Sequence, residues 1–158
     1  MKRHPAFQDL SRDHFTALLA CLHVQRAVDG HESAPPYEDA VARLHTLWKT
    51  ELVHHFDEED QDLAPALERP GGDPFARRLA SDHRNLRATF GALNPDSDPK
   101  DWNAAADALR VHVRWEEDEL FEWMQDTLSE AELDALLEES IAFRTDVRGP
   151  DAVKTKRE

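Results

Sequence analysis

The chain has 158 residues and a formal net charge of −14, with 33 acidic residues against 19 lysines and arginines. This length fits a single domain with its own core, and the negative charge disfavours nucleic acid and anionic membrane surfaces as partners. One cysteine cannot form an internal disulfide. Because no apolar signal segment follows the N-terminal residues, we expect a cytoplasmic protein.

The first predicted helix begins near Pro5 or Ser11 and ends around Asp29-Gly30, because glycine favours a helix stop. Residues 34–36 form a loop, and the second helix opens on Pro36. Pro70-Gly71-Gly72 stops this second helix. Its inner stripe, at the three-to-four spacing of a helix, consists of Val41, Leu44, Trp48, Leu52, His55, Glu59 and Leu63. The inner stripe of the first helix consists of Phe7, Leu10, His14, Leu18, Cys21 and Val28.

The third and fourth predicted helices start at Asp73 and Asp98, each of which precedes a proline in the manner of an N-cap. Residues 94–95, Asn-Pro, break the third helix. Ser129 and Glu132 form a capping box that opens a shorter fifth helix. The inner residues of the third and fourth helices are Phe75, Leu79, His83, Leu86, Phe90, Leu93, Trp102, Leu109, His112, Glu116, Leu120 and Trp123.

These elements predict an all-α protein, an up-down-up-down four-helix bundle with a short C-terminal fifth helix. Residues 1–147 are expected to form a single domain. The polar segment 148–158 is expected to be a disordered tail.

A repeated motif places a histidine four residues before a glutamate on the second and fourth helices. Positions i and i+4 lie about 40° apart around a helix, so each histidine and its glutamate can reach one point. In an antiparallel bundle with short loops, the histidines of the first and third helices fall at the same height. We therefore predict one buried layer of metal ligands, comprising His14, His55, Glu59, His83, His112 and Glu116.

Buried imidazoles and carboxylates without partners are costly, and metal coordination satisfies them. Six nitrogen and oxygen donors suit two metals better than one, and donors without thiolate favour iron or manganese, with zinc as a competitor. The other carboxylates of the acidic runs 57–62 and 116–119 fall off the inner stripe and are predicted to be solvated. His54 and Glu117 each lie about 100° from that stripe.

The chain resembles the hemerythrin-like, or HHE cation-binding, family. The resemblance rests on Asp13-His14, on His55-Phe56 with Glu59 and Leu63-Ala64-Pro65, on Asp82-His83, and on His112 with Glu116-Glu117 and Leu120-Phe121. It implies a four-helix bundle that holds two iron ions per chain in an oxo- or hydroxo-bridged centre. It also implies that Glu59 and Glu116 are the bridging carboxylates. On the donor chemistry, manganese or zinc are less favoured occupants.

Two positions depart from the oxygen-carrying members of that family. Arg87 stands where those proteins have a second histidine on the third helix, and Glu117 stands where they have an aspartate. These departures disfavour plain reversible oxygen carriage. Ferritin-like proteins are excluded because they use E-x-x-H motifs on two helices, and this chain has that order once, at Glu51 to His54.

Two functional classes remain open from the sequence. The first is a module that binds or senses O2, NO or iron itself. The second is a redox enzyme that acts on peroxide, O2 or NO, although no additional acid–base residue falls on the inner stripes to select a reaction. A helical interaction domain with incidental histidines is the third, structural alternative. The oligomeric state stays open.

Overall fold

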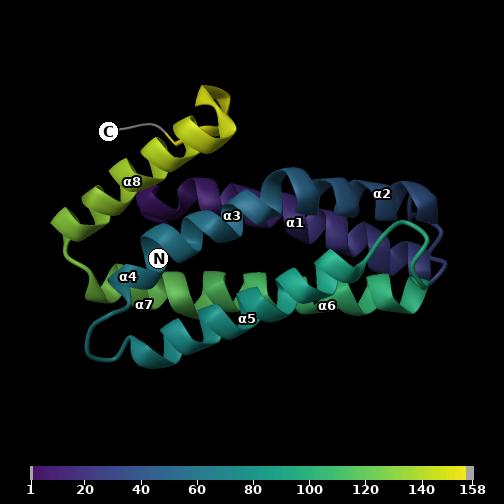
Figure 1. Ribbon diagram of the computed structural model, residues 1–158, viewed down its shortest axis with the longest axis horizontal. Coiled ribbons are helices and arrows are strands. Elements are labelled where there is room, and N and C mark those ends of the chain that lie inside the picture. Colours follow the sequence, from purple (N-terminus) through teal and green to yellow (C-terminus); the bar gives the residue numbers. More distant parts are fainter. Residues whose placement is uncertain (1, 156–158) are drawn as a thin grey trace.

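The computed structural model describes residues 2–155, and in that part of the chain the regular structure is helical, with no strand (Figure 1). This confirms the predicted all-α class. Three of the long helices are regular: α1 spans Pro5–Val28, α5 spans Asp73–Ala92 and α8 spans Glu130–Arg148. No helix among the described residues combines the length and the apolar character that crossing a membrane requires.

The other two long helices each contain π-helical turns. The second runs without a break through α2 (Tyr37–Leu47), η1 (Trp48–Leu52), α3 (Val53–Glu58), η2 (Glu59–Leu63) and α4 (Ala64–Ala66). The fourth runs through α6 (Pro99–Trp115), η3 (Glu116–Leu120) and α7 (Phe121–Thr127).

Two of the π turns begin at the glutamates of the predicted ligand layer, Glu59 in η2 and Glu116 in η3. The N–H of Glu59 still donates to the carbonyl of His55, and that of Glu116 donates to His112. The four-residue spacing that the prediction used is therefore intact up to each glutamate, and the wider turn follows it. Single π turns inside α-helices often occur at functional sites.

Of the three predicted N-terminal caps, two are correct and one is shifted by a residue. Asp98 accepts a hydrogen bond from the N–H of Lys100 and caps α6, and Ser129 and Glu132 form the capping box of α8. The prediction that Asp73 caps α5 is wrong. Gly72 is the N-cap, because its carbonyl accepts from the N–H of Ala76 and so starts the helical ladder one residue earlier.

The core consists of two hydrophobic clusters with a polar layer between them. Leu10 and Leu79 belong to one cluster, and Ala17 and Leu86 belong to the other. The histidines of α1 and α5 lie between these leucine and alanine positions in the sequence. Each fully buried leucine or phenylalanine stabilises the fold by about 1.5–3 kcal/mol, so the two clusters hold the polar layer in place from both sides.

Helix α8 packs against α1, α3 and η2, and Figure 1 shows it lying across the half of the bundle that holds the start of α1. Leu133, Leu136 and Phe143 are buried by this packing. The prediction that the acids beside the ligand stripe are solvated is therefore wrong for Glu58 and Asp62, which are 1% and 7% exposed. The physical reason is that α8 covers the side of the second helix that faces water in a four-helix bundle.

The segment after α8 follows the surface of α1. Pro150–Ala152 form a short 3-10 helix, η4, and the N–H groups of Lys154 and Thr155 each donate to Asp9 at 3.1 Å. Residues 156–158 of the predicted tail lie outside the described residues.

Candidate metal centre

The structure brings all of the predicted donors together in the polar layer, in two groups of four with ligand atoms within 4.8 Å of one another. All are buried, at 2% exposure or less. The His14–His55 group consists of His14, His55, Glu59 and Glu116. The His83–His112 group consists of His83, His112, Glu59 and Glu116. Both glutamates are thus shared.

In the His14–His55 group, the Nε2 atoms of the two imidazoles lie 3.1 Å apart. His14 Nε2 lies 3.1 Å from an oxygen of Glu116, and His55 Nε2 lies 3.2 Å from an oxygen of Glu59. The two imidazoles and the two carboxylates therefore point to one region of space.

In the His83–His112 group, the same two glutamates contact the other pair of imidazoles. His83 Nε2 lies 3.3 Å from Glu59 Oε1 and 3.9 Å from Glu116 Oε1, and His112 Nε2 contacts the same Glu116 oxygen. Each carboxylate thus spans the two groups, as a ligand that bridges two cations must.

The donor atoms fit a pair of cations because most of them lack a hydrogen-bond partner. Both oxygens of Glu59 and of Glu116 are buried without one, and so are the Nε2 atoms of His83 and His112. Leaving such groups unpaired in a protein interior costs roughly 1–3 kcal/mol each, and more when they are charged. Coordination by metal would remove this cost.

Each imidazole is held from behind by a carboxylate on a neighbouring helix. The Nδ1 atom faces that carboxylate, and this fixes the ring so that Nε2 points into the centre. The pairs are His14 with Glu117 (3.3 Å), His55 with Asp13 (2.9 Å), His83 with Asp60 (2.7 Å) and His112 with Asp82 (2.9 Å). The four contacts close a ring around the bundle, because each helix supplies one carboxylate to the next helix.

Sequence reasoning assigned no role to these four carboxylates, although a local signal exists. Asp13 and Asp82 directly precede His14 and His83, while Asp60 and Glu117 directly follow the shared glutamates. A residue next to an inward-facing position points to the flank of its helix, where the adjacent helix lies. An acidic residue directly next to a predicted donor is therefore the sequence signal that could have identified these carboxylates.

The carboxylates determine the protonation of the imidazoles. Burial would lower the pKa of His14, but close contacts with the carboxylates of Glu116 and Glu117 outweigh it and raise the pKa to about 10. Burial is likewise outweighed at His83, where Asp60 and the shared glutamates raise the pKa to about 11. Cation binding at Nε2 must displace these protons, so metal affinity is expected to rise with pH.

Phenylalanine rings support one imidazole in each group. Phe121 is stacked on His14 with ring centroids 5.6 Å apart, and Phe56 is stacked on His83 at 4.3 Å. Both rings are almost fully buried. They exclude water from the faces of the imidazoles and so lower the local dielectric around the centre.

Arg87 does not enter the polar layer. Its guanidinium lies 2.7 Å from Asp60 and 3.0 Å from Asp57 at the surface. Glu117 stays outside the donor groups as the carboxylate behind His14, and accepts hydrogen bonds from the hydroxyl of Ser11. Neither Arg87 nor Glu117 adds a donor, so each group has four protein donors.

A further cluster of His4, Glu130 and Asp134 lies near the surface. Its imidazole accepts a hydrogen bond at Nδ1 from the N–H of Ala6, and Nε2 faces the carboxylates at 3.6 and 3.8 Å. Because Nδ1 is the acceptor, Nε2 carries the proton and serves as a donor to these acids. This geometry describes an ion contact that joins α1 to α8.

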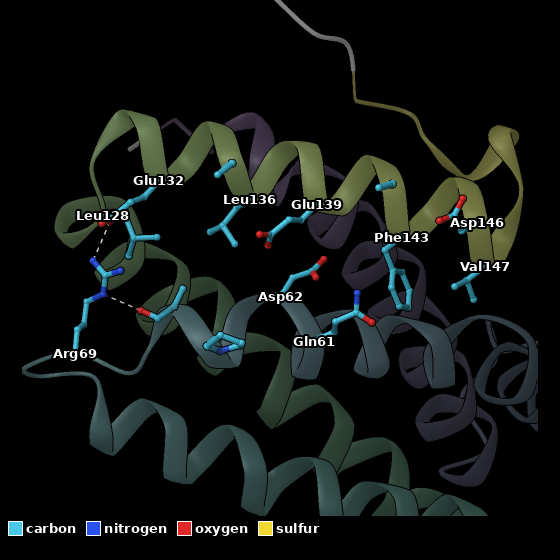
Figure 2. Close-up of a pocket in the computed structure, with 14 residues that line it drawn as sticks. Gln61, Asp62, Arg69, Leu128, Glu132, Leu136, Glu139, Phe143, Asp146 and Val147 are labelled. Atoms are coloured by element: carbon cyan, nitrogen blue, oxygen red, sulfur yellow. Dashed lines mark hydrogen bonds and ion pairs between the residues drawn. The ribbon is translucent and has the colours of Figure 1, made fainter.

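Two surface grooves differ in how they relate to the donors. A groove of about 270 Å³ between α5 and α6 is lined by Leu86, Val111, Asp82 and the ligand-layer residue His112. A larger groove of about 710 Å³ between α8 and η2 does not reach the donors, and Figure 2 shows Asp62 and Glu139 facing each other across it. The α5–α6 groove is therefore the one of these two whose lining includes a donor residue.

Comparison with known families gives one result. A model of the hemerythrin HHE cation-binding domain matches residues 6–124, a segment that contains every donor of the polar layer and excludes α8. No curated protein and no solved structure matches the chain.

Proposed function

This chain belongs to the hemerythrin HHE cation-binding domain family, and on that premise we propose that its polar layer binds two iron ions and presents them to a small ligand such as O2 or NO. The main support is the sharing of Glu59 and Glu116 between two groups of four donors. A single cation would leave two of the buried imidazoles unused. We also propose that α1, the second helix, α5 and the fourth helix form an up-down-up-down bundle, an arrangement that Figure 1 supports.

Iron is the proposed metal because of the donor set. Nitrogen and carboxylate oxygen donors without thiolate suit iron or manganese, with zinc as the competing occupant. Two imidazoles and two carboxylate oxygens leave coordination positions of iron to a small ligand. When bound, such a centre supplies a place for a diatomic molecule and a reversible change of oxidation state.

The protein's own residues set the conditions for that binding. The outer carboxylates hold each imidazole in one tautomer, and the two phenylalanines keep water from the ring faces. The α5–α6 groove is the proposed path for the ligand, because its volume of about 270 Å³ suits a small molecule and its lining includes the donor residue His112.

Binding or sensing is favoured over turnover by what surrounds the donors. Among the described residues, the other buried charged groups are Asp9, Glu58, Asp62 and Arg144, which lie at the α8 interface or beside the C-terminal segment. None of them is placed to transfer a proton to a ligand in the layer. A redox enzyme acting on peroxide, O2 or NO is the alternative.

The test is metal content and an optical spectrum of protein expressed with iron supplied, before and after O2, peroxide or NO is added to the reduced form. We expect two irons per chain and a saturable spectral change at stoichiometric ligand. One zinc, or no metal, contradicts the proposal. Continued consumption of many equivalents of peroxide or NO selects the enzyme instead.

Chelation gives a second readout of the same site. Metal at a thousand times its dissociation constant stabilises the native state by about 4 kcal/mol. For a chain of this length we therefore expect the apo protein to melt about 10 °C below the metal-bound protein. An unchanged melting temperature would place the metal outside the core.

A further inference from the structure

Helix α8 carries a buried arginine that reaches two carboxylates of the bundle. Arg144 is 1% exposed. Its Nε lies 2.8 Å from Glu58 Oε1, and its Nη2 donates to Asp13 Oδ2 at 2.8 Å. Arginine is suited to this task because its planar group presents donors in a fixed fork. The two contacts join α8 to the first and second helices at the level of the polar layer.

The carboxylate that Arg144 contacts is the one that holds His55. Asp13 Oδ2 accepts from His55 Nδ1 at 2.9 Å, and Arg148 donates to the same oxygen at 3.1 Å. Three donors on one oxygen fix its position more firmly than the imidazole alone could. The path from α8 to the donor layer is therefore Arg144, Asp13 and His55, with no gap in the hydrogen bonding.

We propose that Arg144 is a positioning residue for the metal centre, which holds Asp13 and thereby sets the orientation of His55. The proposal rests on the proposed function, because it concerns metal bound at the His14–His55 group. It assigns to α8 a part in the centre although α8 lies outside the residues that the family model matches.

The effect is confined to one group by the geometry. Arg144 has no contact with the carboxylates behind His83 and His112, which are Asp60 and Asp82. Loss of an outer partner of a metal-binding histidine lowers metal affinity by about 10- to 100-fold. The Arg144→Gln variant should therefore bind one metal as the wild type does and the other about 10- to 100-fold more weakly.

Arg69 offers a matched control. Its guanidinium donates to Glu132 of α8 at 2.9 Å, and Figure 2 shows this contact at the far end of the α8 groove. Arg69→Gln removes an arginine that ties α8 to the loop after α4, and the contacts of Arg69 do not lead to an imidazole. This variant should bind both metals with wild-type affinity.

The experiment titrates the chelated full-length proteins with Co²⁺ alone, against a competing chelator, and follows visible absorption and bound metal. We expect two strong sites in the wild type and in Arg69→Gln, and one strong and one weakened site with an altered Co²⁺ spectrum in Arg144→Gln. Arg144→Lys should restore part of the affinity, because a lysine can pair with Asp13 without the second contact. Wild-type affinity in Arg144→Gln, or equal loss in Arg69→Gln, overturns the proposal.

A double-mutant cycle tests the path through Asp13. If Arg144 acts through this carboxylate, Asp13→Asn has the same selective loss, and adding Arg144→Gln lowers metal affinity no further. If the losses of metal affinity in the two single variants add fully in the double variant, Arg144 does not act through Asp13. If Arg144→Gln fails to fold, Asp13→Asn and Arg144→Lys still test the proposal. Unchanged metal affinity in both of these variants overturns it. If the wild type binds no Co²⁺, the proposed function itself is contradicted. If the wild type binds two Co²⁺ and Arg144→Gln binds them equally well, only the role of Arg144 is contradicted.

Discussion

The two halves of the donor layer have the same inner composition and different surroundings. Each has two imidazoles and shares both glutamates. Behind His55, Asp13 is 16% exposed and is held by Arg144, whose side chain is 2% exposed. Behind His83, Asp60 is 40% exposed and is paired with Arg87, which is 37% exposed. One half is therefore braced by a buried ion pair, and the other by a pair that water can replace.

This difference teaches that identical ligands need not give identical metal sites. An ion pair in water contributes about 0–1 kcal/mol, whereas breaking a buried pair leaves a charge that costs several kcal/mol. The His14–His55 group should be the rigid half. The His83–His112 group, whose residue His112 lines the α5–α6 groove, should be the half that rearranges when a ligand binds.

The largest expected effect on metal binding comes from removing a glutamate that the two halves share. Glu116→Ala removes a donor from both groups and should abolish binding of both metals. His83→Ala removes a donor from one group and should leave the other metal bound. Elemental analysis after iron supply distinguishes the two variants. If Glu116→Ala kept both metals, the carboxylate would not bridge them.

The sequence was sufficient to predict the inner layer. Helical periodicity fixes which residues face inward, and short loops fix the height of His14, His55, His83 and His112 in an antiparallel bundle. These are properties of one helix or of one hairpin, and they need no knowledge of how the helices are rotated against each other.

The difference between the halves could not be predicted in this way. It depends on where α8 docks, and a capping box with a leucine stripe predicts a helix but not the face on which it lies. The burial of Glu58 and Asp62 follows from that docking alone. The π turns after Glu59 and Glu116 also have no signature in the composition of these segments.

The next effect compares the outer carboxylates of the two halves. Asp13→Asn should weaken one metal site by about 10- to 100-fold, because a buried amide cannot replace the carboxylate between Arg144 and His55. Asp82→Asn should weaken the other by less than about 10-fold, because Asp82 and its partner Arg78 are partly exposed and water can take the place of the charge. Equal losses in competition titrations would mean that burial does not distinguish the halves.

A smaller effect is expected at Glu117. It faces His14 at 3.3 Å, the longest of the four outer contacts, and its oxygens also accept from the hydroxyl of Ser11. Glu117→Ala should keep both metals and lower the affinity of one by less than about 10-fold. His54→Ala should have no effect, because its imidazole lines an outer groove whose lining includes none of the donor residues. Loss of all metal from Glu117→Ala, with Glu116→Ala intact, would show that Glu117 is itself a ligand.

The smallest expected effect separates the packing of α8 from its contact with the centre. Burial, and then the charge of Glu139, raise the pKa of Asp62 from 3.8 to about 6 in the folded protein. The folded state therefore disfavours the carboxylate: the cost is absent well below pH 3.8, where the group is protonated in both states, and it is complete above about pH 6. A shift of this size corresponds nominally to about 3 kcal/mol, but the groove is open to water and we expect about 1 kcal/mol.

Asp62→Asn should thus stabilise the protein by about 1 kcal/mol at pH 7.5 and by almost nothing at pH 4, as measured by denaturant unfolding of chelated protein beside the wild type. Its metal content should not change. A gain that is equal at both pH values would show that the benefit comes from packing, and not from removing a buried charge between η2 and α8.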